Sequence, residues 1–318
     1  MTVSLALRNS PKISEATRSR VQQMAEKLGY RPDPEISRLM TRLHTSAQSS
    51  DRTPMAIVDL SATRLPPGTE NYCEHVRRGA VKRAESLGYI ASCFHVLDYD
   101  GDIKRLLRVI RYRGIRGILL LPPLAPIELP AGLDWSAFSV LAATYAISGT
   151  EFHRVVPHQF LDMCQLIGIL EKRGLKRIGA VLGRGFEKRI HYHFTAALAL
   201  HRYDSLIFRT DETTPIDKKE FAAWLLEHRP DVLIAANVGE VIDSLPPANR
   251  GFTPPRVVSF RSTSHPHITY WDERPQEIGA VAAVLLAGMV QHNEYGIPAS
   301  PRTTMIHGAL HDPEPVPV

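Results

Sequence analysis

The hydrophobic positions of the first fifty residues follow a helical period. Apolar residues recur at helical spacing over 21–28, and Ser14 is a suitable N-cap before them. A shorter helix is predicted over 2–8, and another begins at Pro34, because proline fits the first turn of a helix. The polar stretch 44–54 is the predicted linker and domain boundary.

Beyond residue 54 the pattern alternates between short apolar strands and amphipathic helices. The first series has the strands "MAIVDL", "IASCFHV", "GIRGILLLPP" and "FSVLAAT", with helices predicted at 71–88 and 102–113. A second series begins near residue 158, includes a helix at 187–201 and ends at "RVVSF". Two such series predict an α/β protein with two doubly wound parallel-sheet lobes and a cleft at the carboxyl ends of their strands.

The last segments are interpreted as chain that crosses back between the lobes. They are "ITYWD", a helix at 275–290 and "TTMIHGAL". We therefore assign about 54–154 and 273–297 to the first lobe, and about 155–272 and 298–318 to the second.

Positive charge is concentrated in the N-terminal segment. The whole chain of 318 residues has a formal net charge of +5, and residues 1–52 hold nine basic and five acidic residues, a net +4. Such an excess fits a segment that meets a polyanion such as nucleic acid. A solvated helical surface of mixed charge is the alternative.

The cysteines and the hydropathy of the chain indicate the cellular compartment in which we expect the protein. Cys73, Cys93 and Cys164 are odd in number, widely spaced and without a CxxC pair, which favours buried thiols in a reducing compartment over a disulfide framework. No signal peptide is visible. The longest apolar run, 279–290, is too short to cross a bilayer, which needs about 20 residues. We expect a soluble, cytoplasmic protein without a membrane partner.

The sequence contains no complete motif for catalysis or metal binding. "GRG" (183–185) lacks the rest of a phosphate loop, and the histidine pairs "HYH" (191–193) and "HPH" (265–267) lack the spacing of zinc ligands. "DYDGD" (98–102) begins like a calcium loop, but Val109 stands where the bidentate glutamate belongs. No GxSxG nucleophile elbow is present. We expect no enzymatic activity, no cofactor and no metal.

The N-terminal segment resembles part of a known family. "TVSLALRNSPKISEATRSRVQQMAEKLGYRPDP" (2–34) resembles the second half of the helix-turn-helix headpiece of the lactose/galactose repressor family of bacterial transcription regulators. Weaker matches follow in the family's order: "RRGAVKRAESLGY", "RGIRGILLLPP", "EKRGLKRIGAVLG" and "RPQEIGAVAAVLL". The resemblance implies a headpiece over 1–31, a hinge helix and linker over 32–53, and two lobes like those of periplasmic binding proteins over 54–318.

The resemblance also implies that one helix is missing. In the family a first helix and a turn precede the "TVS" segment, so 2–7 would be the recognition helix in the major groove. Without the first helix, Val3 and Leu7 would expose apolar surface that it normally covers. We expect the native start to lie roughly 15–20 residues upstream, the length of one helix and a turn. Mass spectrometry of the native N-terminus tests this, and a chain that truly begins at Met1 would bind DNA poorly.

Matching headpiece positions imply DNA-contacting roles. The hydroxyls of Thr2, Ser4, Ser14 and Thr17 would contact phosphates, Tyr30 would contact the DNA backbone, and Lys12 would approach the DNA from a loop. Leu5 stands where several members read bases with arginine, but a leucine can touch only a thymine methyl group. Leu39, in "PEISRLMTRL", matches the hinge-helix leucine that enters the minor groove. A leucine that packs between helices is the alternative.

The cleft departs from the family pattern for sugar effectors. Val238 follows "AAN" where an aspartate is usual, and Arg261 and Ser262 follow "VVSF" where two acidic residues are usual. Since carboxylates accept the hydroxyl hydrogens of sugars, their loss argues against a simple monosaccharide. Arg261 and Arg189 could favour an anionic effector, or could form surface or inter-lobe salt bridges. Three further candidates for the cleft lie near predicted strand ends: Tyr72, Asn237 and Trp271.

We therefore predict a homodimeric transcription regulator, by family habit a repressor. A small-molecule effector bound between the lobes would control its affinity for a double-stranded DNA operator. One alternative is a solute-binding protein of the same fold, which would need an export signal. Another is a truncated sensor that acts by dimerisation without binding DNA. The chain ends in "HDPEPVPV" without leucine heptads, so a tetramer through such a helix is not expected.

Overall fold

The chain divides into two compact units, residues 1–52 and 53–318, and each is described by itself. The computed structural model describes residues 3, 6, 14–28, 53–66, 68–211, 214–262, 265 and 267–312. Several expectations from the sequence lie outside these residues: the helix from Pro34, the linker up to residue 52, and the proposed DNA contacts of Thr2, Ser4, Leu5, Lys12, Tyr30 and Leu39.

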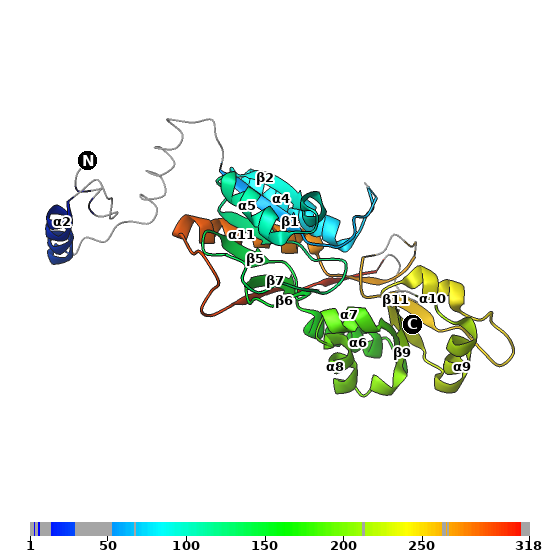
Figure 1. Cartoon of the computed structure of the whole chain (residues 1–318). Helices are drawn as coiled ribbons and strands as arrows, with labels where there is room; N and C mark the ends of the chain where they lie inside the picture. Colours follow the sequence, from blue (N-terminus) through cyan, green and yellow to red (C-terminus); the bar gives the residue numbers. More distant parts are fainter. Residues whose placement is uncertain are drawn as a thin grey trace. The chain divides into compact units, whose positions relative to one another are not determined.

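In the first unit, the helix predicted from the apolar pattern is confirmed as α2 (Glu15–Lys27), with Ser14 at its N-cap (Figure 1). Ser14 does not cap the helix with its side chain; instead its Oγ lies 2.9 Å from Oγ1 of Thr17. No residue of α2 is buried, and Met24 is 54 % exposed. The apolar face of this helix is thus accessible among the described residues.

The first lobe of the second unit is built on a six-stranded sheet in the order β13-β7-β5-β3-β1-β2, with every neighbouring pair parallel. Its strands are β1 (Pro54–Asp59), β2 (Ile90–His95), β3 (Gly117–Leu120), β5 (Ser139–Ala142), β7 (His153–Pro157) and β13 (Thr303–Ile306). A small two-stranded sheet, β4 (Ile127–Glu128) with β6 (Ile147–Ser148), and a 3-10 helix, η1 (Val96–Tyr99), complete the lobe.

Helices cover both faces of this sheet. One face packs on α4 (Tyr72–Ser86) and α11 (Pro275–His292), and the other on α5 (Ile103–Tyr112) and the 127–152 region. The helices α4 and α11 approach each other closely through glycines. A Cβ at Gly79 would lie 1.9 Å from the carbonyl oxygen of Gln276, and one at Gly279 would lie 1.9 Å from that of Val76.

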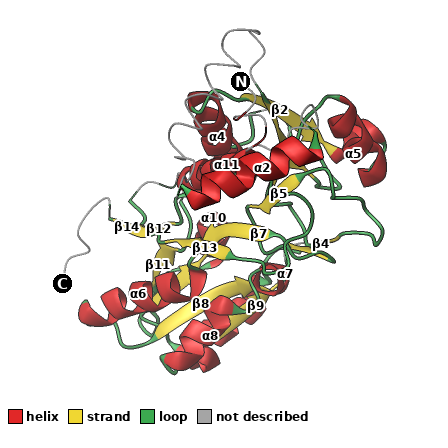
Figure 2. Ribbon diagram, turned by 90° about the vertical axis from the view of Figure 1, so that its left-hand side faces the viewer, coloured by secondary structure: helices red, strands yellow, loops and turns green. Residues whose placement is uncertain are grey.

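The second lobe has a sheet in the order β14-β12-β11-β10-β8-β9, in which only the β12–β14 pair is antiparallel. Its strands are β8 (Ile178–Gly183), β9 (Ile207–Thr210), β10 (Val232–Ala235), β11 (Arg256–Ser259), β12 (Tyr270–Asp272) and β14 (Ala309–His311). The helices α6 (Gln159–Lys172) and α8 (His193–Leu200) cover one face, and α9 (Lys218–His228) and α10 (Val238–Ser244) the other. Figure 2 distinguishes the strands (yellow) from the helices (red).

The chain passes between the lobes three times. β7 leads into α6 through His158, β12 leads into α11 through Glu273 and Arg274, and β13 leads into β14 through His307 and Gly308. The predicted α/β architecture with two doubly wound lobes is therefore present, and the last segments do cross back between them.

Three details of the sequence prediction were wrong. Segment 298–318 was assigned to the second lobe, but β13 pairs in parallel with β7 in the first sheet. The first lobe also continues beyond 154, because β7 ends at Pro157. The single helix predicted at 187–201 is two helices, α7 (Arg184–Arg189) and α8, because His191 and Tyr192 adopt left-handed φ values of 53° and 59° that end the first helix.

Candidate functional site

A cavity of about 170 Å³ lies between the two lobes. Its walls come from the ends of first-lobe strands and the start of α4 on one side, and from α6, α7 and the segments after β11 and β12 on the other. The lining residues are Asn71, Tyr72, Cys73, Pro122, Pro123, Leu124, Ala143, Thr144, Tyr145, Ala146, Val156, Pro157, Gln159, Phe186, Arg189, Ile190, Arg261 and Glu273. Three of the five effector candidates from the sequence, Tyr72, Arg189 and Arg261, are among them.

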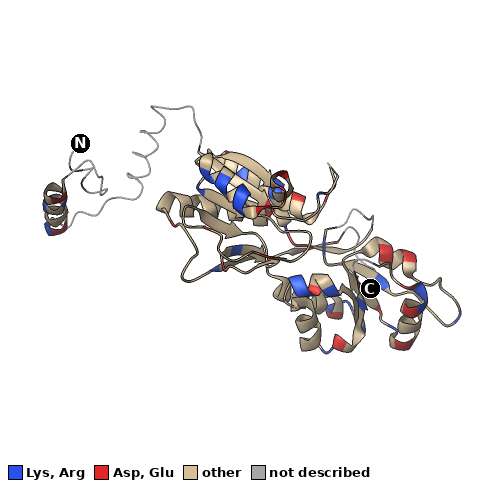
Figure 3. Cartoon of the chain, in the orientation of Figure 1, with Lys and Arg blue, Asp and Glu red and all other residues tan. Residues whose placement is uncertain are grey.

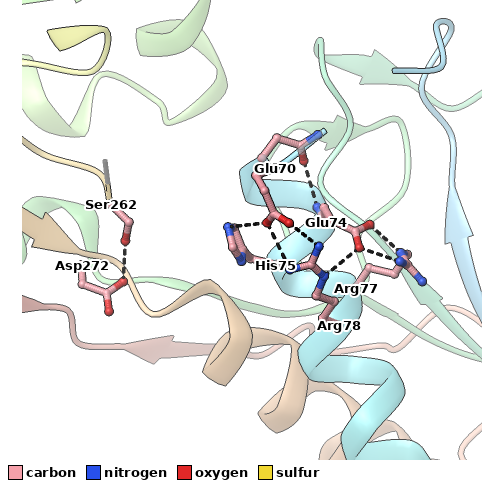
Figure 4. A network of polar contacts seen from close by, with 8 residues as sticks. Glu70, Glu74, His75, Arg77, Arg78, Ser262 and Asp272 are labelled. Atoms are coloured by element: carbon pink, nitrogen blue, oxygen red, sulfur yellow. Dashed lines mark hydrogen bonds and ion pairs between the residues drawn. The ribbon is translucent and has the colours of Figure 1, made fainter. Parts of the chain in front are cut away.

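Tyr72 is held in place by the N-terminus of α4. The Asn71 side chain caps this helix by accepting a hydrogen bond from the Glu74 backbone N–H at 2.9 Å. Ion pairs of Arg78, shown in Figure 4, join the second turn of α4 to the segment before the helix and to its first turn: Arg78 contacts Glu70 at 2.5 Å and Glu74 at 2.9 Å. Burial raises the pKa of the Tyr72 hydroxyl well above its ordinary value, and nearby Glu273 adds to this shift. Tyr72 therefore presents a neutral hydroxyl to the cavity.

Arg261 projects from the segment that follows β11. Its backbone is fixed by Ser259, whose Oγ donates to the Arg261 carbonyl oxygen at 2.7 Å. The guanidinium carbon lies 4.8 Å from the centre of the Phe186 ring, a cation–π contact. Its Nε is buried without a hydrogen-bond partner. This positive side chain is thus stacked and positioned, while its hydrogen-bonding capacity remains unused among the described residues.

Glu273 lies in the second crossing between the lobes and is 5 % exposed. It accepts a long hydrogen bond of 3.5 Å from Nε2 of Gln159. Gln159 is 7 % exposed, and its Oε1 is buried without a partner among the described residues. Desolvation raises the pKa of Glu273 to about 7, although Arg261 and the hydrogen bond from Gln159 oppose the shift. A buried carboxyl group that titrates near neutrality therefore lies at one wall of the cavity.

Arg189 connects the lobes directly. Its Nη1 donates to the carbonyl oxygen of Leu124 in the first lobe at 2.8 Å, and its guanidinium lies 5.5 Å from the Phe186 ring centre. Tyr145 makes a second contact across the cleft, edge-to-face with His191 at 5.6 Å. Both contacts depend on the distance between the lobes, so they would change if the cleft opened or closed.

The other two effector candidates lie elsewhere. Asn237 lines an adjoining cavity of about 410 Å³ in the second lobe, where its side chain caps α10 and donates to Glu240 at 2.8 Å. Phe186, Arg189 and Arg261 line both cavities. Trp271 is 4 % exposed and belongs to the core of the second lobe. It packs so closely on Gly308 that a Cβ there would lie 2.0 Å from its Nε1.

Sequence reasoning missed Gln159, Phe186 and Glu273. Gln159 directly follows the first crossing between the lobes, and Glu273 lies in the second. A polar residue just beyond a strand such as "TYWD" is a usable signal for the carboxyl edge of a sheet. Nothing in the sequence marked Phe186 as a cavity residue, because an aromatic residue in a short helix is usually part of the core.

Charge is distributed less simply than the net count indicated. In the N-terminal segment, the helix α2 carries both basic and acidic residues, as Figure 3 shows. The first lobe contains a local basic patch that the sequence prediction overlooked. Six cations and no acidic residue occur over 103–116, all on exposed positions: Lys104, Arg105, Arg108, Arg111, Arg113 and Arg116. Some of these are paired, as Arg111 is with Asp134 at 3.2 Å.

Residues 1–33 match the sequence model of the family described as "Bacterial regulatory proteins, lacI family". The chain is 26 % identical over 311 residues to the HTH-type transcriptional repressor CytR of Escherichia coli strain K12, covering 93 % of this chain and 87 % of the repressor. These relatives are named as regulators of transcription and not as enzymes.

Solved structures share the fold. A regulatory protein of the LacI family from Chloroflexus aggregans is 17 % identical with a TM-score of 0.58, covering 82 % of this chain and 98 % of that one. The Lac repressor bound to ONPG in its repressed state is 14 % identical with a TM-score of 0.57, covering 98 % and 94 %. Within the described residues, no helix has the length and apolar character needed to span a membrane.

Proposed function

On the premise that this chain belongs to the lactose/galactose repressor family, which the matches at its N-terminus and along its length support, we propose that it is a DNA-binding transcriptional repressor controlled by a small ligand between its lobes. The single observation that carries this proposal is a lacI-type segment at 1–33 followed by a two-lobed unit with a cavity at the lobe junction. The alternative of a solute-binding protein is not favoured, because the relatives are regulators.

The DNA-contacting part would be the N-terminal segment. Ser14 and Thr17 lie at the start of α2, and their hydroxyls face each other without capping the helix. The free backbone N–H groups of the first turn and these hydroxyls together form a suitable contact for a phosphate. Further contacts are proposed for positions outside the described residues: Thr2, Ser4, Leu5, Lys12, Tyr30 and Leu39.

The ligand-responsive part would be the cleft. A ligand that binds one separation of the lobes more tightly than another shifts the equilibrium between open and closed forms. The affinity for DNA can change only through this difference between the ligand's affinities for the two forms. The bond from Arg189 to Leu124 joins the lobes and would take part in this change. We propose that two copies of the chain pair to bind a two-fold symmetric operator, in the cytoplasm where bacterial DNA lies.

A binding assay with matched variants tests the DNA-contacting role. Fluorescence anisotropy would compare DNA from the promoter region of this gene with random DNA of equal length. We expect Ser14→Ala with Thr17→Ala to weaken promoter binding roughly tenfold, since each lost contact is a hydrogen bond to a charged group. The control is Lys104→Gln with Arg108→Gln in the basic patch, which should leave the ratio of promoter to random binding unchanged.

The assay also separates the alternatives. Equal affinity of the unaltered chain for promoter and random DNA would contradict the proposal. Unchanged promoter binding in the Ser14 and Thr17 variant would contradict their phosphate contacts while leaving the regulator itself standing.

A further inference from the structure

We propose that the cleft binds a small organic carboxylate with an apolar body and a hydrogen-bond donor, and that the guanidinium of Arg261 binds its carboxylate. This inference rests on the proposed function, because it names the class of ligand for the same cleft. It is drawn from the unused polar groups of the cavity and from the character of the remaining wall.

The first observation is that the guanidinium of Arg261 has no hydrogen-bonded acidic partner among the described residues. No hydrogen bond or ion pair to its guanidinium is found among the described residues, and its Nε is buried. The Phe186 ring supports the guanidinium from one side, and Ser259 fixes the backbone. A half-buried guanidinium without a hydrogen-bonded counter-ion is unfavourable, so an anion that supplied two acceptor oxygens would gain charge-assisted hydrogen bonds.

The second observation is that Glu273, the acidic residue of the cavity lining, attracts Arg261 electrostatically but forms no ion pair with it. The hydrogen bond of 2.9 Å from Ser262 to Asp272 ties together the two segments that carry Arg261 and Glu273 (Figure 4). Burial also raises the pKa of Glu273, which leaves this carboxyl group less charged near neutral pH than an exposed one. The cavity therefore keeps a positive electrostatic character.

The third observation is a buried hydrogen-bond acceptor, Oε1 of Gln159, that the ligand would have to satisfy. Oε1 of Gln159 is an acceptor without a partner in a side chain more than nine-tenths buried, so it requires a donor such as a hydroxyl or amine. Two other polar groups of the wall are already occupied: Asn71 caps α4, and Oγ1 of Thr144 accepts from the Ala146 N–H at 2.9 Å. Neither is available to pair with the hydroxyls of a sugar.

The rest of the wall is apolar. Pro122, Pro123 and Leu124 face the cavity from the first lobe, and Phe186 and Ile190 face it from the second. Such a surface favours an aliphatic or aromatic body between the lobes, with the carboxylate toward Arg261 and the donor toward Gln159.

Calorimetric titration of the full chain tests this assignment. The probes are benzoate, 4-hydroxybenzoate and 3-phenyllactate, each paired with its neutral amide, together with ribose and glucose. We expect at least one carboxylate to bind and its amide to bind roughly ten- to a hundredfold more weakly, because a charge-assisted hydrogen bond is lost. We expect Arg261→Met to weaken binding of the carboxylate by the same factor, and Arg261→Lys to weaken it less.

The matched control is Arg184→Met, at an exposed arginine on α7 that pairs with Asp211 at 3.8 Å outside the cavity. Circular dichroism and thermal unfolding would verify that each variant is folded. Equal binding of carboxylates and amides, tighter binding of the sugars, or full carboxylate affinity in Arg261→Met would each overturn the inference.

Promoter binding by the same proteins separates this inference from the proposed function. If the chain binds its promoter DNA and a neutral probe releases it, the ligand class is wrong and the regulator stands. If the chain does not distinguish promoter from random DNA, the proposed function fails whatever the carboxylates do.

Discussion

At the scale of single residues, Glu273 should make the stability of the chain depend on pH. Its pKa is raised from an ordinary 4.5 to about 7, so the folded chain binds this proton more tightly than the unfolded chain does. The free energy of unfolding should therefore fall as the pH rises from about 4.5 to about 7, and stay lowered above that.

Glu273→Gln removes this titrating group while keeping its shape. At pH 8 we expect the variant to be more stable than the unaltered chain by up to about 3 kcal/mol, the free energy that corresponds to the shift of the Glu273 pKa. Loss of the attraction between the Glu273 carboxylate and Arg261 would reduce this gain. Near pH 4 the two proteins should unfold alike. Urea titrations across this range measure the difference, with the exposed Glu277→Gln as the control. An unaltered chain whose stability is flat between pH 4.5 and 7 would contradict the assignment.

The sequence identified some site residues by their place near a strand end, as with Tyr72, and others because they broke an expected pattern. Arg261 was noticed because it replaces an acidic residue after "VVSF", and the structure places it on the cavity wall. Glu273 and Gln159 could not be found by that route, because their importance comes from burial and from partners distant in sequence. Trp271 was chosen as a cleft residue because it lies at a strand end, but that position does not reveal that its side chain faces the core.

At the scale of elements, the packing of α4 against α11 depends on glycine. A methyl group at Gly279 would lie 1.9 Å from a backbone carbonyl oxygen, which cannot move aside like a side-chain tip. We expect Gly279→Ala to destabilise the chain by about 1–3 kcal/mol, the usual cost of overpacking a core.

Gly288→Ala is the matched control on the same helix. An added Cβ there meets no atom within 4 Å, so the change should be neutral or stabilise by up to about 1 kcal/mol through the better helix propensity of alanine. Thermal unfolding of both variants measures the contrast. The packing account would be wrong if Gly279→Ala proved as stable as Gly288→Ala.

The element pattern was predictable because apolar strands and amphipathic helices alternate with clear periods. The exceptions have physical reasons. β7, "HRVVP", has a short apolar run flanked by polar residues, and β13, "TTMI", contains no information about which sheet edge it joins. The break between α7 and α8 depends on left-handed backbone at His191 and Tyr192, which non-glycine residues seldom adopt.

At the scale of the whole molecule, the three crossings between the lobes place the cavity where lobe movement and ligand binding must be coupled. Two contacts that span the cleft, from Arg189 to Leu124 and from Tyr145 to His191, involve no residue of either core, so they can be exchanged without unfolding either lobe. A ligand that bridges Arg261 and the first-lobe prolines would favour one arrangement of these contacts over another.

The most direct test of the account is therefore the linkage between the cleft and DNA. The affinity of the tightest-binding probe for the chain would be measured by titration with and without saturating promoter DNA, and the affinity for DNA with and without that probe. Linkage requires both affinities to change by the same factor. We predict a common factor of roughly 5 to 150, whereas a probe whose affinity is the same with and without bound DNA would contradict the claim that the cleft controls DNA binding.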